Sequence, residues 1–382
     1  MTINQENRLD KKFFKKVKDI FRKYLALCFL LFLQGCSELN QKTSTVKIFD
    51  NQKIHFDQNK TYYDSEILIR DNGRLVFKKI ALPNFNRNIT ATIEARLVSI
   101  GDPWDKSGSL FLLNTHPDSI NTKSLELLRF VTPFGVGHFS ISDKLDEYKP
   151  VYIPSWKKEI RWSEDISHLS SVLTGQVWIG AWIDTWHKDG FELDVSLTMN
   201  ESPFLLDKKT KQQIHVLANT HKYSNKHNGE FDFSTQDLIV NFELKKDVKN
   251  AKLFFTITGH GAHSNGDEFN QRDNVITVND EILRTFPAWR DDCASFRSFN
   301  PSSGVWFEET TFKGEIIQER IASSDYSRSN WCPGSAVAPE MIELGELNKG
   351  KHIFSYSIPN AQPTTEEFWN HWNLSYYLLY DY

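Results

Sequence analysis

Apolar and polar residues alternate along much of this chain, which is the pattern of β-strands with one buried face. From Ile93 to Leu97 and from Leu193 to Met199, apolar side chains occupy every second position, and charged or hydroxyl side chains lie between them. Glycine, asparagine, aspartate and proline separate the apolar runs and favour turns. Many short strands divided by turns predict an all-β protein built from sandwiches. The further runs are Leu238–Leu244, Lys252–Thr258, Val275–Val278 and His352–Ile358.

The composition supports this class and indicates the number of domains. The 382 residues include 51 aromatic side chains and only 3 methionines, which favours β-rich material over helical bundles. Because 40% of the residues are apolar and 25% are charged, a disordered or collagen-like chain is excluded. About 100–200 residues form one domain, so this length predicts about two. The polar stretch from Asp207 to Phe233 is expected to hold the junction, with domains over residues 46–205 and 206–382.

The N-terminal residues have the features of an export signal. Eight basic residues between Arg8 and Lys23 precede the apolar run Leu25–Leu33, and the small residue Gly35 follows it. The apolar run is too short to span a bilayer, which needs about 20 apolar residues. Together with Cys36, the end of this run resembles a bacterial lipoprotein processing site, at which the cysteine is lipidated.

Residues 1–36 are therefore expected to form a lipoprotein signal peptide that ends at the lipidated Cys36, and residues 37–45 a linker. The alternative is an ordinary signal peptide or a short anchor. In each case the body of the protein is exported. We expect it to be attached to a bacterial outer membrane through the N-terminal lipid only, on the periplasmic or the cell-surface side, or to be secreted if no lipid is added.

The net charge indicates which partners the protein can bind, and the cysteine content indicates the redox state of its compartment. Removal of residues 1–35 leaves 37 basic and 46 acidic side chains, a formal net charge of −9. No nucleic-acid partner is therefore expected. Apart from Cys36, only Cys293 and Cys332 remain, and an oxidising compartment favours a disulfide between them that closes a loop of about 40 residues. The alternatives, a metal site or a free nucleophile, are weaker because neither has another cysteine within two to four positions.

One expected strand carries a row of aromatic side chains. From Gln176 to Trp186, a period of two places Trp178, Trp182, Asp184 and Trp186 on one face and aliphatic residues on the other. Aromatic rings stack on the C–H face of sugar rings and a carboxylate accepts hydrogen bonds from hydroxyls, so this row suits a carbohydrate. The alternative is that the tryptophans pack between sheets with Asp184 at the rim. Trp186, at the strand end, is the one expected to be accessible.

Two loops also concentrate polar side chains. After the strand that ends near Thr258, the chain places His260 and His263 close to two acids, and its glycines permit tight turns. A metal site is one alternative, although the spacing is not His-Glu-x-x-His and no cysteine pair accompanies it. A solvated turn is the other. Earlier in the chain, Trp104-Asp105-Lys106 sets an acid between an aromatic and a base just before the apolar run Leu110–Leu113, and alone it could be a plain turn.

Several segments together resemble the peptide-N-glycosidase F family, amidases that release N-linked glycans from asparagine. The likeness runs in family order from about Val46 to the C-terminus, and its Trp-Cys-Pro-Gly run is specific. The segments are Trp104-Asp105-Lys106, Arg129-Phe130-Val131-Thr132-Pro133-Phe134-Gly135-Val136-Gly137, Asp184-Thr185-Trp186, Gly259-His260-Gly261 with Glu268, and Arg328-Ser329-Asn330-Trp331-Cys332-Pro333-Gly334.

The resemblance implies an all-β fold of two tandem eight-stranded antiparallel jelly-roll sandwiches packed side by side, with the active site at their interface. It implies that Asp105 is the principal catalytic aspartate and that Glu268 assists at the cleaved amide. Asp184 is also expected to be catalytic and stands where the family reference has a glutamate. Cys293–Cys332 corresponds to one family disulfide.

Five residues match substrate-binding positions of the family: Trp104, Lys106, Trp186, His260 and Arg328. Two of them depart from the family pattern, because Lys106 replaces an arginine and His260 replaces a tryptophan of the cleft. Two other family disulfides are absent. Lysine lacks the rigid fork of arginine, and Asp184 is one methylene shorter than glutamate. Glycan preference and rate therefore do not follow from the resemblance.

Amide hydrolysis explains why these residue types are needed. The reaction requires an activated nucleophile, stabilisation of the developing oxyanion and a proton for the leaving amine. We expect Asp105 to orient and deprotonate the water, and Glu268 to bind the first sugar or deliver the proton. Arg328 is expected to stabilise negative charge or to hold a carboxylate. Carboxylates that lie close together repel, so one pKa should rise toward neutrality.

Asp184 and Trp186 are expected to bind the chitobiose core of the glycan. The products would be aspartate in the peptide and a glycosylamine that later loses ammonia, and the reaction needs no metal or other cofactor. The expected partners are N-glycosylated proteins and glycopeptides, and the protein is expected to be a monomer.

Two other functions are compatible with this sequence. One is a surface glycan-binding lipoprotein that has lost turnover, although Asp105 and Glu268 are retained. The other is a copper monooxygenase, because related jelly-roll pairs hold copper. Such sites use histidine clusters and a methionine ligand, and only Met199 and Met341 remain after the signal peptide.

Overall fold

The computed structural model describes residues 42–59, 62–63, 66–119, 122–136, 151–204, 211–221, 223, 231–263, 265–303 and 305–381. The expected signal peptide and its lipidation site, Cys36, lie outside these residues. Strand β1 begins at Thr43, inside the expected linker of residues 37–45. In the described part, no helix is long and apolar enough to cross a membrane.

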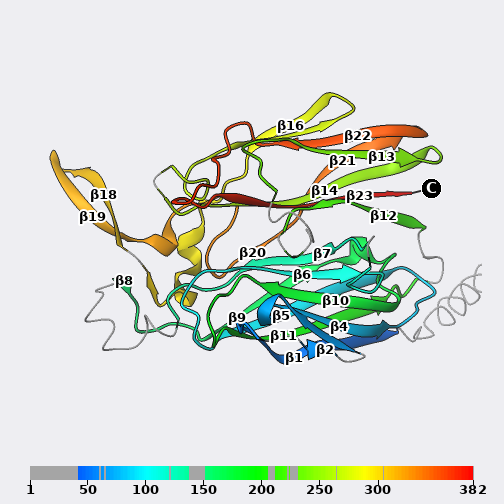
Figure 1. Ribbon diagram of the computed structural model, residues 1–382, viewed down its shortest axis with the longest axis horizontal. Helices are drawn as coiled ribbons and strands as arrows, with labels where there is room; N and C mark the ends of the chain where they lie inside the picture. The colour runs from blue at the N-terminus through cyan, green and yellow to red at the C-terminus, as the bar shows by residue number, and fades with distance from the viewer. Residues whose placement is uncertain are drawn as a thin grey trace, which may run out of the picture.

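The N-terminal half is a sandwich of two antiparallel sheets (Figure 1). Alternation explains why the strands assemble in this way, since in β11 every second side chain is buried between the sheets. The first sheet has the order β1 (Thr43–Ile54), β11 (Phe191–Glu201), β5 (Ile89–Ser99), β9 (Glu159–Asp165). The second has the order β2 (Tyr62–Tyr63), β3 (Ile67–Arg70), β4 (Leu75–Leu82), β10 (Gly175–Ile183), β6 (Ser107–Leu113), β7 (Leu125–Val131), β20 (Ala336–Val337).

The C-terminal half is a second sandwich of two four-stranded antiparallel sheets. Its core contains Phe255 and Ile257 of the central strand and the aromatic rings of Phe354, Tyr356 and Tyr376. One sheet has the order β12 (Gln212–Asn219), β23 (His371–Asp381), β14 (Val248–His260), β21 (Glu340–Leu347). The other has the order β13 (Leu238–Leu244), β22 (Gly350–Ser357), β15 (Asp273–Val278), β16 (Glu281–Pro287).

The expected all-β class and the pair of antiparallel sandwiches are confirmed. Each apolar run predicted from the alternation lies in a strand, except that β22 ends one residue before Ile358. The polar stretch that begins at Asp207 is not free of regular structure, because β12 forms within it and pairs with β23. The apolar residues Ile214, Val216 and Leu217 of β12 pack against the two cores, and of these three only Leu217 is buried.

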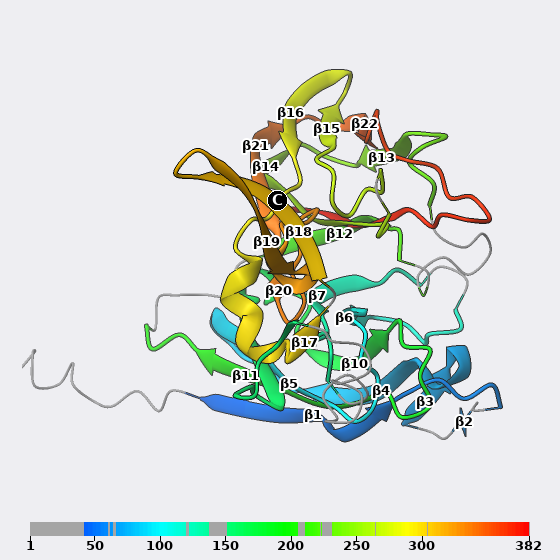
Figure 2. The same cartoon turned by 90° about the vertical axis from the view of Figure 1, so that its left-hand side faces the viewer.

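Several strands are buried on both faces because the two sandwiches pack against each other. In β23, Leu374, Tyr376 and Leu378 enter the C-terminal core, whereas Tyr377 on the opposite face joins the N-terminal core. Strand β20 lies late in the chain but pairs with β7 of the N-terminal half. The interface is therefore formed by two facing sheets, and Figure 2 shows β7 and β20 of one sandwich next to β12 of the other.

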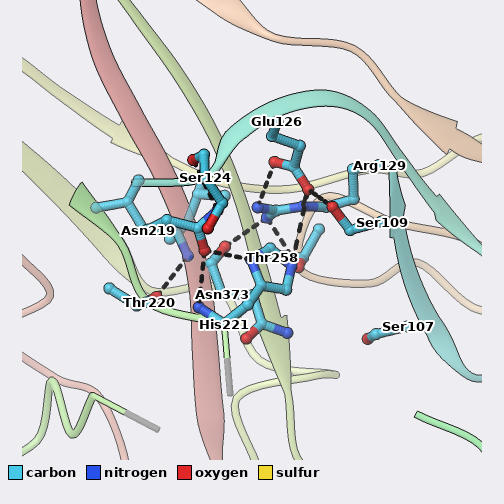
Figure 3. A network of polar contacts seen from close by, with 12 residues as sticks. Ser107, Ser109, Ser124, Glu126, Arg129, Asn219, Thr220, His221, Thr258 and Asn373 are labelled. Carbon is cyan, nitrogen blue, oxygen red and sulfur yellow. Dashed lines mark hydrogen bonds and ion pairs between the residues drawn. The ribbon is translucent and has the colours of Figure 1, made fainter. Parts of the chain in front are cut away.

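A buried polar network crosses this interface (Figure 3). On β7, the Arg129 and Glu126 side chains form an ion pair with Nη2 and Oε2 2.8 Å apart, and both are almost fully buried. Ser109 Oγ on β6 donates to Glu126 Oε1 (2.7 Å). From the same guanidinium, Nη1 donates to the carbonyl of Asn373 on β23 and contacts Thr258 Oγ1 on β14. These contacts fix the end of β14 and the start of β23 against the N-terminal sheet.

Smaller elements complete the molecule. The hairpin of β18 (Val305–Phe312) and β19 (Glu315–Ala322) projects from the body (Figure 1), and β17 (Ser302–Ser303) pairs with β8 (Val151–Tyr152) across the two halves. A disulfide joins Cys293 to Cys332. The expected pairing is thus confirmed, and neither cysteine is a free thiol. The 3₁₀ helices are η1 (Asp71–Gly73), η3 (Ser167–Leu169), η4 (Cys293–Phe299) and η5 (Ser323–Asp325).

Candidate active site

A cavity of about 360 Å³ lies where the two sandwiches meet. It contains polar and aromatic side chains from both halves, including all three carboxylates expected at the site. The N-terminal half contributes Asp105, Lys106, Ser107 and Asp184. The C-terminal half contributes His260, Gly261, Ala262, His263, Glu268, Trp331, Glu367, Phe368, Trp369 and His371.

A larger cavity, of about 580 Å³, lies on the outer face of the β1-β11-β5-β9 sheet. Arg96 in its wall is already paired, since its guanidinium contacts Glu159 (2.7 Å) and Asp194 (2.8 Å). None of the residues expected at the site lines it. The cavity between the sandwiches is therefore the candidate active site.

Arg328 lies between two of the expected catalytic carboxylates. Its Nε donates to Glu268 Oε1 (3.0 Å), and its Nη2 lies 3.8 Å from Asp105 Oδ2. Asp105 comes from the N-terminal half and Glu268 from the C-terminal half, so the buried guanidinium links the two halves at the cavity. Opposite charge and hydrogen bonding favour the ionised form of both acids.

Burial nevertheless dominates the electrostatics of both carboxyl groups. Withdrawal from water raises the pKa of Glu268 to about 7, and the negative charge of Asp105 adds to this rise, whereas Arg328 opposes it. Burial also raises the pKa of Asp105, against the lowering effects of Arg328 and Lys106. The site therefore combines two acids whose pKa values are both raised above the ordinary value, mainly by burial.

The chain around Arg328 holds the guanidinium rigidly. Its Nη1 donates to the carbonyl of Tyr326 (3.0 Å), and the group lies over the rings of Phe269 (4.8 Å) and Trp331 (4.9 Å). Main-chain hydrogen bonds in both directions join Arg328 to Arg290. The next residue donates its N–H to the carbonyl of Glu268 (2.9 Å), so the Arg328 and Glu268 segments are bonded side by side.

Asp267 anchors the loop that carries Glu268. Its buried carboxylate accepts hydrogen bonds from Arg272 Nε (2.8 Å), Trp372 Nε1 (2.8 Å) and the Gln362 N–H (2.9 Å). At the start of the loop, Gly261 has a φ of 147°, and a Cβ there would lie 2.2 Å from Asn370 Oδ1. A glycine is therefore needed where the loop with Glu268 approaches the segment with Asn370.

A second buried aspartate, Asp102, organises the opposite wall. One of its carboxylate oxygens accepts from the Trp104 N–H (3.0 Å) and the other from Thr185 Oγ1 (2.6 Å). The loop with Asp105 is thus joined directly to the segment between Asp184 and Trp186. Two stretches of chain that lie about 80 residues apart form one wall because of this side chain.

Asp184 is paired with an arginine that the sequence analysis missed. Arg74 Nη1 lies 3.1 Å from Asp184 Oδ1, and its guanidinium lies over the Trp186 ring at 4.0 Å. Strand β10 ends at Ile183, so Asp184 and Trp186 belong to the loop after it. Trp186 is exposed, as expected from its position at the strand end. The sequence around Arg74 does not indicate its pairing with Asp184, because 110 residues separate the two.

The row of tryptophans on β10 is not a continuous sugar-binding surface. Trp178 and Trp182 are buried, which agrees with the alternative that the tryptophans pack between sheets. They form a cluster with Leu75, Phe77 and Phe111. As the period of two predicts, Trp178 and Trp182 lie on the same face of β10. However, the face that carries these tryptophans is covered by the C-terminal half, whose Tyr223 packs on Trp182.

His260 forms part of the cavity wall but is mostly buried, and not in a solvated turn. Its ring stacks between Trp331 (5.2 Å) and His371 (4.7 Å), and Nε2 contacts Thr258 Oγ1 (3.0 Å) and Ser107 Oγ (3.3 Å). Burial lowers its pKa well below the ordinary value, so the imidazole is neutral. His263 contacts a different partner, Asn370 Oδ1 (3.1 Å).

The described residues include no group of three or more His, Cys, Asp or Glu side chains that could hold a metal ion. The two methionines considered as copper ligands lie elsewhere. Met199 is buried in the N-terminal core, and Met341 is exposed on β21.

The remaining expected residues are near the cavity. Trp104 is exposed beside Asp105 and packs edge-on against Phe134 (5.5 Å). Lys106 lines the cavity, and its main-chain N–H donates to Thr132 Oγ1 (2.7 Å). Besides Arg74, sequence reasoning missed Asp102, His371 and the segment Glu367-Phe368-Trp369. Two adjacent exposed aromatics after an acid were a signal that could have identified this segment.

Two family models match most of the described chain. Residues 45–199 match the model "Peptide-N-glycosidase F, N terminal", and residues 228–379 match "Peptide-N-glycosidase F, C terminal". Among curated protein sequences, none matches this one.

Solved structures share the fold. PNGF-II is 29% identical with a TM-score of 0.74, and the match covers 89% of this chain and 66% of that chain, slightly less than two thirds. PNGase F, a glycosylasparaginase from Flavobacterium meningosepticum, is 16% identical with a TM-score of 0.58, covering 89% of this chain and 96% of that chain. A peptide-N(4)-(N-acetyl-beta-D-glucosaminyl) asparagine amidase is 17% identical with a TM-score of 0.60 and the same coverage. At these identities the last two support the fold alone. With both family models matched in order, the chain belongs to the peptide-N-glycosidase F family.

Proposed function

We propose that this protein is an amidase that hydrolyses the bond between the asparagine side chain and the first N-acetylglucosamine of N-linked glycans. One observation carries the proposal: Arg328 contacts both Asp105 and Glu268 beside a cavity between the sandwiches. The pair supplies one carboxylate that can accept a proton and one carboxylic acid that can donate one near neutral pH.

In the proposed reaction, Asp105 accepts a proton from water as the water oxygen attacks the amide carbonyl carbon. The positive charges of Arg328 and Lys106 favour the ionised, basic form of Asp105. As the carbon–nitrogen bond breaks, Glu268 donates its proton to the leaving nitrogen. The products are an aspartate in the peptide and a glycosylamine, and Asp105 then returns a proton to Glu268 directly or through water.

Substrate binding is assigned to the walls of the cavity. Asp184 can accept hydrogen bonds from the hydroxyls of the first two sugars, and Trp186 offers an exposed indole for stacking on one of their rings. Arg74 positions both side chains. Lys106 and the neutral His260 line the same cavity, and the exposed Trp104 precedes Asp105 in the chain, so these three are assigned to substrate binding as well. N-glycosylated proteins and glycopeptides are the proposed substrates, and the proposed active species is a monomer.

The first test compares glycan release with glycan binding. The body of the protein, starting after Cys36, is incubated with a glycoprotein that carries high-mannose chains, alongside Asp105→Asn and Glu268→Gln variants. We expect the wild type to release glycan and each variant to bind it while release falls by about 10²- to 10⁴-fold. A wild type that binds glycan without releasing it would establish the glycan-binding alternative. Release by Asp105→Asn at the wild-type rate would refute the assignment of the base.

The proposed location is outside the cytoplasm, and the Cys293–Cys332 disulfide is consistent with export. Attachment through a lipid on Cys36 is part of the proposal. A Cys36→Ser variant expressed in a bacterial host should therefore move from the membrane fraction to the soluble exported fraction. An unchanged distribution would mean that Cys36 is not the anchor.

A further inference from the structure

Exposed tryptophans lie in the cavity wall and close in the chain to two of the carboxylates that line it. Among the described side chains, three tryptophans keep nearly half of their surface exposed: Trp104 (47%), Trp186 (49%) and Trp369 (47%). Trp104 and Trp186 flank Asp105 and Asp184 on the N-terminal side, whereas Trp369 lines the cavity on the C-terminal side. Exposing large aromatic surfaces is unfavourable, so a group of them around one cavity indicates a binding surface.

Trp369 lines the cavity and packs on one of the histidines of its wall. Its ring packs on His371 with centroids 5.1 Å apart, and His371 stacks on His260 at 4.7 Å. His260 in turn contacts Ser107 of the N-terminal half. Two imidazole rings therefore separate Trp369 from the wall near Ser107. Phe368, which is 41% exposed, and Glu367 line the cavity beside Trp369.

The segment that carries these aromatics is held in place by hydrogen bonds. The Phe368 N–H donates to Thr365 Oγ1 (2.9 Å), and the Asn370 N–H donates to Thr364 Oγ1 (3.1 Å). Asn370 Oδ1 also accepts from the N–H of Asp267 (3.1 Å), the residue before Glu268. The aromatic rim is thus joined to the Glu268 loop and needs little reordering when a ligand binds.

We propose that Trp369 and Phe368, together with Glu367, bind a hexose of the glycan beyond its first two sugars. This inference rests on the proposed function, in which Asp184 and Trp186 bind the first two. A sugar ring requires a flat apolar partner for its C–H face and hydrogen-bonding groups for its hydroxyls. Trp369 supplies the first, and the Glu367 carboxylate and the His263 imidazole, which packs on Phe368 at 4.4 Å, supply the second.

The test uses two glycopeptides with the same peptide sequence, one carrying chitobiose and the other a full high-mannose chain. Trp369→Ala and Phe368→Ala are expected to lower kcat/KM for the high-mannose substrate roughly three- to tenfold, the range for one aromatic stack. The chitobiose substrate should be cleaved at the wild-type rate. Phe204→Ala, which removes an aromatic that is 72% exposed outside the cavity, is the matched control and should change neither rate.

Equal losses on both substrates would overturn the proposal and indicate that the rim contacts the polypeptide or the chitobiose core. Unchanged rates on both would overturn it as well. If Trp369→Ala lowers the thermal stability, Glu367→Gln replaces it, because this conservative change keeps the size of the side chain and should lower the high-mannose rate alone.

Failure of the proposed function has a different signature, since the wild type would then cleave neither substrate. In that case, titration calorimetry with free high-mannose oligosaccharide decides the inference. Weaker binding by Trp369→Ala than by the wild type would support the subsite, and equal binding would overturn it.

Discussion

Among single residues, Arg328 determines how the two carboxyl groups of the proposed active site are paired. A guanidinium presents donors in a planar fork, which allows Nε to bond Glu268 while Nη2 faces Asp105. An ammonium group could preserve the charge but not both directions of contact. The two acids need this shared counterion, because burial alone raises the pKa of each.

Arg328→Lys is therefore expected to lower kcat/KM for glycopeptide hydrolysis by about 10²-fold, within the range for loss of one preorganised electrostatic contact. Steady-state kinetics on a single glycopeptide measures the effect. Arg161→Lys, at an exposed arginine on β9, is the control and should leave the rate unchanged. Wild-type kinetics for Arg328→Lys would mean that charge alone suffices.

The raised pKa of Glu268 predicts how kcat/KM depends on pH. Because the pKa of Glu268 is raised to about 7, the group holds its proton below that pH and loses it above. If Glu268 donates the proton to the leaving nitrogen, kcat/KM must fall as the pH rises through about 7. Glu268→Gln should be slower at every pH and should lack this alkaline fall. A wild-type profile that stays flat from about pH 6 to pH 9 would contradict the role of Glu268 as an acid.

The sequence predicted part of the site through local runs. Asp105, Asp184, Glu268 and Arg328 lie in or near segments that resemble the family, and the structure brings all four to one cavity or its wall. Arg74 could not be predicted, because its partner Asp184 lies in a distant segment. The partners of a charged side chain depend on tertiary packing, and alternation along a strand does not encode them.

At the scale of elements, the loop between β14 and β15 places Glu268 at the cavity because Asp267 fixes this loop. This carboxylate accepts three hydrogen bonds, from Arg272, Trp372 and the main chain of Gln362. It therefore ties the Glu268 loop both to β23 and to the segment with the exposed aromatics. Glu268 therefore keeps its position relative to Arg328 through an anchor that does not line the cavity.

Asp267→Asn should destabilise the protein by about 3 kcal/mol, because it removes the counterion of the partly buried Arg272 guanidinium. It also replaces one buried oxygen acceptor by an NH₂ donor, which then faces another donor. Activity should fall as well, since Glu268 is the next residue. Urea denaturation gives the free energy of unfolding. Asp273→Asn, an exposed aspartate in β15, should change it by less than about 0.5 kcal/mol. Equal stability of both variants would show that Asp267 is not an anchor.

At the scale of the whole molecule, the interface between the sandwiches creates the site, because neither half contains both Asp105 and Glu268. Alternation predicted the strands correctly where one face is buried, as in β5 and β11. It could not predict that β23 is buried on both faces, or that β20 joins the sheet of the other half, because strand pairing across domains has no local signal. For the same reason Trp178 and Trp182 suggested a sugar-binding surface although they are buried.

The buried Arg129–Glu126 pair tests how strongly the halves are coupled. Arg129→Met leaves Glu126 buried without its partner and removes the contacts to Asn373 and Thr258, so the free energy of unfolding should fall by about 3–5 kcal/mol. Adding Glu126→Gln should restore part of the loss, because a buried amide costs less than a buried charge. Losses that simply add in the double variant would contradict this coupling.

The central claim is that water attacks the carbonyl carbon of the glycosylated asparagine, and the most direct measurement is product identity in H₂¹⁸O. A high-mannose glycopeptide is digested with the exported body of the protein, and the peptide is analysed by mass spectrometry. We expect the asparagine to become an aspartate carrying one ¹⁸O atom and the complete glycan to be released. An asparagine that still carries an N-acetylglucosamine, or an unmodified asparagine without ¹⁸O, would contradict it.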